Sequence, residues 1–282
     1  MAVAWESRRS TSRSSRLLAL GYAWSGFLIM WAFWVSFVVF LATPRWAAQH
    51  WPLPTVDQGG LDVHPVAAAV IDLCLISMFG LQHSLMARPW FKSHVMAHVP
   101  AAFQRATYVH AANTCLLSLI VFWQPINIEV WSVSAPLRDL LWIGFVAGWV
   151  ILLVGALSFG IFDLLGIDQM RAWALNRPPP TSRLKTGFLY RTLRHPMYVG
   201  VLLALWSTPR MSVGHLLLAY GMTLYVLVAL RYEERDLARS FGRAYQQWRT
   251  RLTPANSADV HIRPATRSMM STRTTRPNPP PP

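Results

Sequence analysis

Residues 191–200 have the sequence RTLRHPMYVG and concentrate hydrogen-bonding side chains at the start of an apolar run. His195 stands directly before Pro196, which is favoured in the first turn of a helix, and the free amides of that turn attract anions. Tyr198 follows in the same turn, and Gly200 lets a ligand or another backbone approach closely. These residue types suit a polar ligand site at a membrane boundary. Arg and Tyr also form interfacial belts without any ligand, so this second interpretation stays open.

A second polar segment, residues 231–248, has the sequence RYEERDLARSFGRAYQQW and contains two adjacent carboxylates, Glu233 and Glu234. They follow a long apolar run in a chain that has only 12 acidic residues. A carboxylate at this position could hold the amino group of a bound cofactor. Alternatively, the pair makes local ion pairs with neighbouring arginines on a solvated helix face, each contributing a few tenths of a kcal/mol.

The composition of the chain is that of a membrane protein. Of its 282 residues, 53% are apolar and 13% are charged, whereas soluble domains have about 25% charged residues. The net charge of +14 comes from basic residues that flank apolar runs, so membrane orientation explains the charge better than nucleic-acid binding does. Cys74 and Cys115 lie inside apolar runs, and no CxxC or HExxH spacing occurs, so we expect no metal site.

The apolar runs predict an all-α, polytopic membrane helix bundle. A spanning helix needs roughly 20 apolar residues, and four runs are candidates: residues 17–42, 65–86, 108–123 and 137–165. The last apolar region, 196–230, is split by STPR, where a proline should break the helix. We therefore predict four spans plus a C-terminal helical hairpin, which gives five to six transmembrane helices. The hairpin either dips into the bilayer or makes two ordinary spans.

The distribution of basic residues predicts the orientation of the bundle. Of the 26 basic residues, all but Arg45, Arg138 and Arg210 fall in four segments: the N-terminal tail, residues 87–106, residues 166–194 and the chain after residue 230. The positive-inside rule places these segments, and both termini, in the cytoplasm. The hairpin must then enter and leave the membrane on the cytoplasmic side.

Four regions of the chain follow from this topology. The sequence after Pro254 is rich in Ser, Thr, Arg and Pro and has too few apolar residues to form a core. The predicted regions are an N-terminal tail at 1–16, transmembrane helices 1–4 at 17–165, a loop, hairpin and C-terminal helix at 166–253, and a disordered tail at 254–282.

Taken together, RHPMYVG and, about 30 residues later, EERDLARSFGRAYQQW resemble the C-terminal core of the integral-membrane methyltransferases. This family includes isoprenylcysteine carboxyl methyltransferases, phospholipid methyltransferases and NnrU-like proteins. Its members enclose S-adenosylmethionine between the two segments at the cytosolic face. The resemblance covers residues 188–252 approximately. It implies that a cofactor pocket in the 166–253 region is lined by Tyr190, His195, Pro196, Met197, Tyr198, Gly200, Glu233 and Glu234.

Further segments are similar to the bacterial methanethiol S-methyltransferases, over residues 81 to 253 approximately. These segments are LQHSLMARPWFK, QRATYVHAANTCLLSLIVFWQP, FDLLGIDQM and STPRMSVGHLLLA. Such enzymes transfer the methyl group of S-adenosylmethionine to methanethiol and release dimethyl sulfide. The similarity implies a small volatile thiol as substrate and a place in the bacterial inner membrane. Gly160 and Ile161 stand where an Asn-His pair is expected, so no role for that histidine is carried over.

If the reaction is thiol methylation, the candidate catalytic residues are His83, Arg88 and Arg194. The thiolate is the nucleophile, and a cysteine-type thiol titrates near pH 8.5, so a base or a nearby positive charge helps at neutral pH. His83 is the candidate base, and the two arginines could lower the pKa of the thiol. The structural alternatives are a histidine bound to a backbone carbonyl and arginines bound to lipid phosphates.

Two other functional classes remain open from the sequence. The same core could methylate another thiol, a prenylcysteine carboxylate or a lipid. A non-enzymatic NnrU-like protein, such as a transporter or sensor subunit, would place polar residues near the middle of the bilayer. The polar clusters lie at one face, which favours the enzyme. Within the predicted spans, Asp72 and His110 are expected to form a structural bridge between helices.

Overall fold

The computed structural model describes residues 12–44, 47–180, 184–185 and 187–251, and these are mainly helical. The long helices are α1 (Arg13–Ala42), α3 (Pro65–Ala87), α5 (Ala101–Val121), α6 (Leu137–Phe159), α9 (Pro196–Trp206) and α10 (Val213–Arg251). The shorter elements are α2 (Ala47–His50), α4 (Pro89–His94), α7 (Ile161–Leu164), α8 (Ile167–Ala174), the 3-10 helix η1 (Phe188–Arg191), β1 (Glu129–Ser132) and β2 (Arg210–Ser212). The prediction of an all-α membrane bundle is confirmed. The predicted tail at 254–282 lies outside the described residues.

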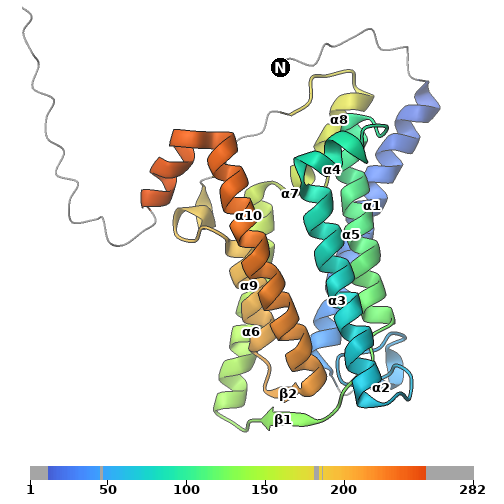
Figure 1. Cartoon of the computed structure of the whole chain (residues 1–282), viewed down its shortest axis with the longest axis vertical. Helices are drawn as coiled ribbons and strands as arrows, with labels where there is room; N and C mark the ends of the chain where they lie inside the picture. The colour runs from blue at the N-terminus through green and yellow to red at the C-terminus, as the bar shows by residue number, and fades with distance from the viewer. Residues whose placement is uncertain (1–11, 45–46, 181–183, 186, 252–282) are drawn as a thin grey trace, which may run out of the picture.

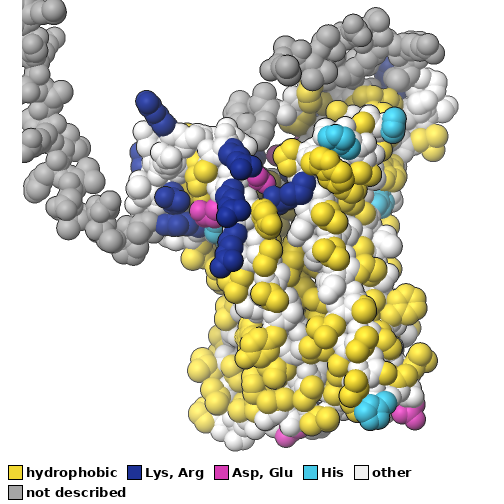
Figure 2. Space-filling view, viewed as in Figure 1, with side chains coloured by type: hydrophobic (Ala, Val, Ile, Leu, Met, Phe, Trp, Pro, Cys, Tyr) yellow, Lys and Arg dark blue, Asp and Glu magenta, His cyan; other side chains and the backbone are white. Residues whose placement is uncertain are grey.

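Four of the described helices, α1, α3, α6 and α10, are long and apolar enough to cross a membrane. The sequence predicted five or six spans, and the difference lies in α5 and α9. Helix α5 has 21 residues but carries polar side chains in its first half, and α9 has only 11 residues. Both run alongside the longer helices (Figure 1). Apolar side chains cover most of the bundle in Figure 2, as expected for a surface that faces lipid.

The two ends of the bundle differ in charge. One end, here called the basic end, carries the start of α1, the helices α4, α7 and α8, and the end of α10 (Figure 1). The other, called the sheet end, carries α2, β1 and β2. Of the Lys and Arg residues that the structure describes, only Arg138 and Arg210 lie at the sheet end. Residues 87–106 and the described part of 166–194 therefore lie at one end of the bundle, as the basic-residue count predicts.

The helices form two groups that meet along the core. Helices α1, α3 and α5 pack together, and α6, α9 and α10 form the second group (Figure 1). At the sheet end, β1 and β2 pair antiparallel, with Glu129 opposite Ser212 and Ser132 opposite Arg210. The predicted break at STPR is confirmed, because α9 ends at Trp206 and α10 begins at Val213. The apolar pattern did not predict the two short strands.

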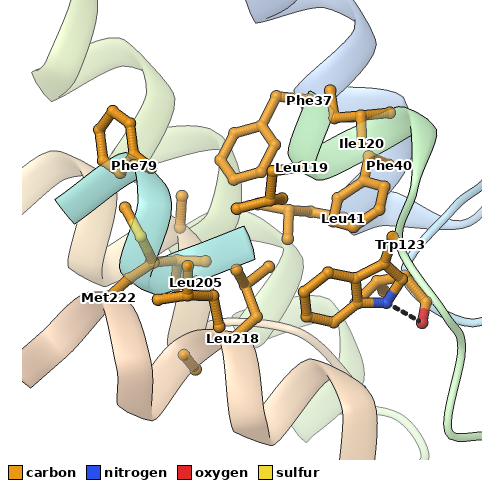
Figure 3. Close-up of a cluster of buried hydrophobic side chains, with 14 of the residues drawn as sticks. Phe37, Phe40, Leu41, Phe79, Leu119, Ile120, Trp123, Leu205, Leu218 and Met222 are labelled. Carbon is orange, nitrogen blue, oxygen red and sulfur yellow. Dashed lines mark hydrogen bonds between the residues drawn. The ribbon is translucent and has the colours of Figure 1, made fainter. Parts of the chain in front are cut away.

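A single large core connects the two groups. It is built mainly of aromatic and branched side chains from all six long helices and from Trp123, whose indole nitrogen donates to the Val56 carbonyl at 3.2 Å. In Figure 3, Phe79 and Met222 lie at one end of the cluster and Trp123 at the other. The core therefore holds the end of α3 that carries Phe79 against α10. The side chains drawn include Phe37, Phe40, Leu41, Leu119, Ile120, Leu205 and Leu218.

Helices α6 and α9 touch through their backbones. A Cβ atom on Gly200 would lie 2.5 Å from the Leu152 amide nitrogen and 2.7 Å from the Gly148 carbonyl oxygen, closer than any real side chain approaches. Gly200 therefore serves helix packing, and its role in lining the cofactor pocket stays a prediction. Met197 faces the same helix, with its Cγ atom 3.1 Å from the Cβ position of Gly155. This close contact sets the position of α9 and of the polar residues at its start.

Replacing Gly200 with alanine is expected to lower the free energy of unfolding by about 1–3 kcal/mol, because the added methyl group overpacks the α6–α9 contact. Gly21, in α1, has open space around its Cβ position, so Gly21→Ala is the matched control and should be neutral or stabilising. Thermal unfolding in detergent measures both. Equal melting temperatures for the two variants would contradict the packing role of Gly200.

The expected bridge between Asp72 and His110 is wrong. Asp72 is fully buried and accepts a hydrogen bond from the Gln124 amide at 2.9 Å. His110 Nε2 lies 2.9 Å from the Tyr22 carbonyl oxygen and so donates to α1. Asp72 thus binds the backbone just beyond the end of α5, whereas His110 binds a carbonyl within α1.

Candidate functional site

The start of α9 and the middle of α10 meet through charged hydrogen bonds. His195 caps α9, and Pro196 occupies its first turn, as the sequence predicts. His195 Nε2 lies 2.9 Å from Glu234 Oε1, and since a carboxylate only accepts, the imidazole nitrogen must donate. The Tyr198 hydroxyl donates to Glu233 Oε2 at 2.8 Å. The two segments that the resemblance pairs therefore lie in direct contact.

Helix α10 has 39 residues, about twice the length that a bilayer requires, so its half after Arg231 extends beyond the membrane. It bends at Gly242, whose φ of +48° favours glycine. The bend brings the last turns back towards η1, where the Trp248 indole nitrogen donates to the Tyr190 carbonyl at 3.2 Å. This turn of the chain closes one side of the site.

The electrostatics of the site favour the ionised form of Glu234. Burial alone would raise the pKa of Glu234, but the hydrogen bond from His195 and the charge of Arg194 outweigh it and lower that pKa. Arg249 adds a second positive group, 3.9 Å from Glu234 Oε2. Burial, with Glu233 nearby, raises the pKa of Tyr190 to about 12, so its hydroxyl stays protonated at neutral pH.

A pocket of about 150 Å³ opens beside these groups. It is lined by Phe159, Leu184, Lys185, Tyr190, Arg194, Glu233, Leu237, Phe241 and Trp248. Pockets for drug-sized ligands measure about 300–1,000 Å³, so this pocket accommodates part of such a ligand. A larger hollow of about 510 Å³ lies at the sheet end, around Trp51, and none of the predicted site residues line it. We assign the site to the smaller pocket because the charged groups converge there.

Several lining residues escaped the sequence analysis. Lys185, Leu237, Phe241 and Trp248 come from the loop before η1 and from both sides of the bend in α10. The only signal in the sequence was the aromatic residues of the FGRAYQQW stretch. This signal is weak, because aromatic side chains are common near a membrane boundary for other reasons. Lys185 also lies 4.0 Å from Asp163, which binds Gln169 at 2.8 Å and Arg105 at 3.2 Å. Asp163 thus helps to hold the lining residue Lys185 in position.

His83 lies in an aromatic surrounding near the end of α3. Its ring centroid is 5.0 Å from that of Tyr108, 5.2 Å from Phe79 and 6.0 Å from Tyr225. Its Nδ1 atom is buried and has no hydrogen-bond partner among the described residues. The structural alternative, in which a backbone carbonyl binds the histidine ring, does not account for this nitrogen. A buried, unpartnered nitrogen is available to a small ligand.

The surroundings of His83 border the carboxylate site. Tyr108, Tyr198 and Tyr225 lie within electrostatic range of one another and of Glu233. Tyr198 belongs to the α9–α10 contact, whereas Tyr108 and Tyr225 contact the His83 ring. The structure thus places two neighbouring polar regions at the basic end, one with carboxylates and one with an imidazole.

The two candidate arginines occupy different places. Arg88 pairs with Asp236 at 3.2 Å, and its guanidinium lies over the Tyr232 ring at 4.6 Å, so it ties the end of α3 to α10. Arg194 lines the pocket with Glu233 and donates to the Arg249 carbonyl at 3.5 Å. Activation of a thiol by either arginine stays a prediction. Among the described residues, no three His, Cys, Asp or Glu side chains gather as a metal site requires.

Comparison with known proteins places these features in a family. Residues 142–244 match the family model described as phospholipid methyltransferase. The matched range runs from α6 to the bend of α10, which agrees with the packing of α6 on α9 and includes every residue of the α9–α10 contact. No solved structure matches the chain.

The chain is similar to several curated relatives over most of their length. The chain is 39% identical to the methanethiol S-methyltransferase of Pseudomonas deceptionensis, over 69% of this chain and 74% of that protein. It is 33% identical to methanethiol S-methyltransferase 1 of Bradyrhizobium diazoefficiens, over 86% and 83%. It is also 34% identical to Nurim of Xenopus laevis, over 60% and 62%. With its apolar helices and the joined α9–α10 segments, the chain belongs to the methanethiol S-methyltransferase family of integral-membrane methyltransferases.

Proposed function

We propose that this protein transfers a methyl group from S-adenosylmethionine to methanethiol and releases dimethyl sulfide, at the cytoplasmic face of a bacterial inner membrane. The observation that carries the proposal is that two polar regions lie near each other at the basic end. The His195–Glu234 and Tyr198–Glu233 bonds form the donor side, and the free Nδ1 atom of His83 forms the acceptor side. The names of the curated relatives support the same reaction.

The donor side fits a cofactor that carries positive charge. S-adenosylmethionine would supply a methyl group on a positively charged sulfur, next to an amino group and an adenine ring. Glu233 and Glu234 can accept from the amino group, and the rings of Phe159, Tyr190 and Trp248 offer faces to a cation or a base. The ionised state of Glu234 at neutral pH suits this role. Pro196 and Met197 remain predicted neighbours of the cofactor.

The acceptor side needs to remove a proton. Methylation forms a bond between the thiol sulfur and the methyl carbon and breaks the bond of that carbon to the donor sulfur, while the thiol proton leaves. His83 Nδ1 is placed to accept that proton, since it is buried and unpartnered in the described chain. The aromatic rings around it exclude water and keep the sulfur close to the donor side. Arg88 contributes by holding α3 against α10.

The orientation in the membrane follows from charge. The basic end carries nearly all of the described Lys and Arg residues, and the positive-inside rule assigns such an end to the cytoplasm. Figure 2 shows several of these side chains over the upper part of α10. The donor and acceptor regions lie at that end, where a soluble cofactor can reach them. Both termini are then cytoplasmic.

Headspace gas chromatography on the purified protein in detergent tests the reaction. We expect dimethyl sulfide only when S-adenosylmethionine and methanethiol are both present. If no product forms while S-adenosylmethionine still binds by calorimetry, the acceptor is another thiol, a prenylcysteine carboxylate or a lipid. If S-adenosylmethionine does not bind and no product forms, the proposed methyl transfer is wrong, and a non-enzymatic role in the membrane is the remaining alternative.

A further inference from the structure

Three aromatic residues from three helices enclose the imidazole of His83. Phe79 comes from α3, Tyr108 from α5 and Tyr225 from α10, and the Phe79 and Tyr225 rings also contact each other at 5.3 Å. We call this group, with the His83 ring, the aromatic chamber. Its members contact each other edge to face or at a tilt, so their rings form walls rather than a stack.

The chamber is closed towards the sheet end. Helices α3 and α10 approach so closely there that a Cβ atom on Gly80 would lie 3.3 Å from the Tyr225 ring, and one on Gly221 would lie 3.0 Å from Ile76. Phe79 is itself buried in the core and lies beside Met222 (Figure 3). A ligand at His83 therefore cannot extend along the helices towards the sheet end without displacing core side chains.

The chemistry of the chamber walls suits a short alkyl thiol. His83 Nδ1 is buried and has no hydrogen-bond partner in the described chain. The Tyr108 hydroxyl donates a long, weak hydrogen bond to the His83 backbone carbonyl at 3.4 Å, so this hydroxyl already has a partner on α3. Sulfur packs favourably against aromatic rings, and an alkyl group gains contact with them. The sulfur of an acceptor would face the nitrogen, and its carbon chain would meet the rings.

We propose that Phe79, Tyr108 and Tyr225 set the upper length of the alkyl group that the acceptor thiol can carry. This inference rests on the proposed function, since it describes the acceptor side of that reaction. Their ring centroids lie 5.0–6.0 Å from that of the imidazole, so a thiol whose sulfur faces Nδ1 would bring its alkyl group against these rings, and a longer chain would press on Phe79 and Tyr225. A pocket of this kind discriminates by roughly 10- to 200-fold for each methylene group. Tyr108, whose ring centroid lies 5.0 Å from that of His83, forms the third wall of the aromatic chamber.

The test compares thiol length preference between wild type and Phe79→Ala. The rate of methylation of butanethiol relative to methanethiol is measured by headspace gas chromatography. Affinities for dimethyl sulfide and for butyl methyl sulfide are measured by calorimetry, which needs no catalysis. We expect Phe79→Ala to raise both butyl-to-methyl ratios at least tenfold, because removal of the ring leaves space for the longer chain.

Three further variants control the test. Phe79→Leu keeps more of the core and is used if the alanine variant fails to fold. Tyr225→Phe keeps the ring and should leave the length preference unchanged. Phe122 is exposed at the end of α5, so Phe122→Ala should also leave it unchanged.

The two readouts separate this inference from the proposed reaction. An unchanged length preference in the binding measurement for both Phe79 variants overturns the chamber. A shifted binding preference, together with no methylation of methanethiol by the wild type, supports the chamber and overturns the reaction. A Phe122→Ala variant that shifts as much as Phe79→Ala also overturns the chamber, because the effect is then not specific to these walls.

Discussion

Replacement of Glu234 with alanine is expected to weaken S-adenosylmethionine binding by roughly 30- to 3,000-fold, while the protein still inserts into the membrane. Truncating one partner of a hydrogen-bonded charge pair across a binding interface, here Glu234 with the amino group of the cofactor, costs about 2–5 kcal/mol, and each 1.4 kcal/mol is tenfold in affinity. Glu234 accepts from His195 at 2.9 Å and lies 3.9 Å from Arg249, so its removal leaves positive groups without their carboxylate. His195→Ala should act in the same direction. Calorimetry in detergent measures the affinity.

Two variants make the result specific. Glu234→Gln keeps an oxygen that can accept from His195 but removes the charge, so it separates the charge from the hydrogen bond. Glu129→Ala removes an exposed carboxylate at the sheet end and should leave binding unchanged. Normal affinity in Glu234→Ala and in His195→Ala would remove the α9–α10 contact from the cofactor site.

Replacement of His83 with alanine is expected to lower the turnover number by about 100-fold or more at neutral pH, with little loss of S-adenosylmethionine affinity. General acid–base catalysis contributes 10²–10⁴-fold in typical enzymes. The Nδ1 atom of His83 is buried and unpartnered in the described chain, so it is free to take the thiol proton. The donor side has its own residues and is left intact. Initial rates of dimethyl sulfide release measure the effect.

The pH dependence distinguishes a base from a structural residue. If His83 accepts the thiol proton, the rate of His83→Ala should rise with pH as solution thiolate forms, so its deficit relative to wild type shrinks. A purely structural residue would give a deficit that does not change with pH. His94, on α4, is exposed and bonded to Ser93, so His94→Ala is the control and should keep wild-type turnover. Equal turnover of His83→Ala and wild type would rule out His83 as the base.

The sequence by itself determined the features that depend on local patterns. Apolar run lengths predicted the bundle, and Pro209 predicted the break between α9 and α10, because a proline removes a backbone donor wherever the chain is helical. The basic residues predicted which loops share an end. The residue types of His195, Tyr198, Glu233 and Glu234 indicated a polar site through the family resemblance, and the structure brings those four side chains together.

Only the tertiary structure decided which side chains face which partner. Gly200 lies against α6, Arg88 pairs with Asp236, and Asp72 and His110 bind backbone groups instead of each other. The aromatic chamber draws on three helices, so no local window of sequence contains it. Helix periodicity specifies which face of a helix is apolar, but the rotation and neighbours of that face depend on packing contacts between residues far apart in the chain.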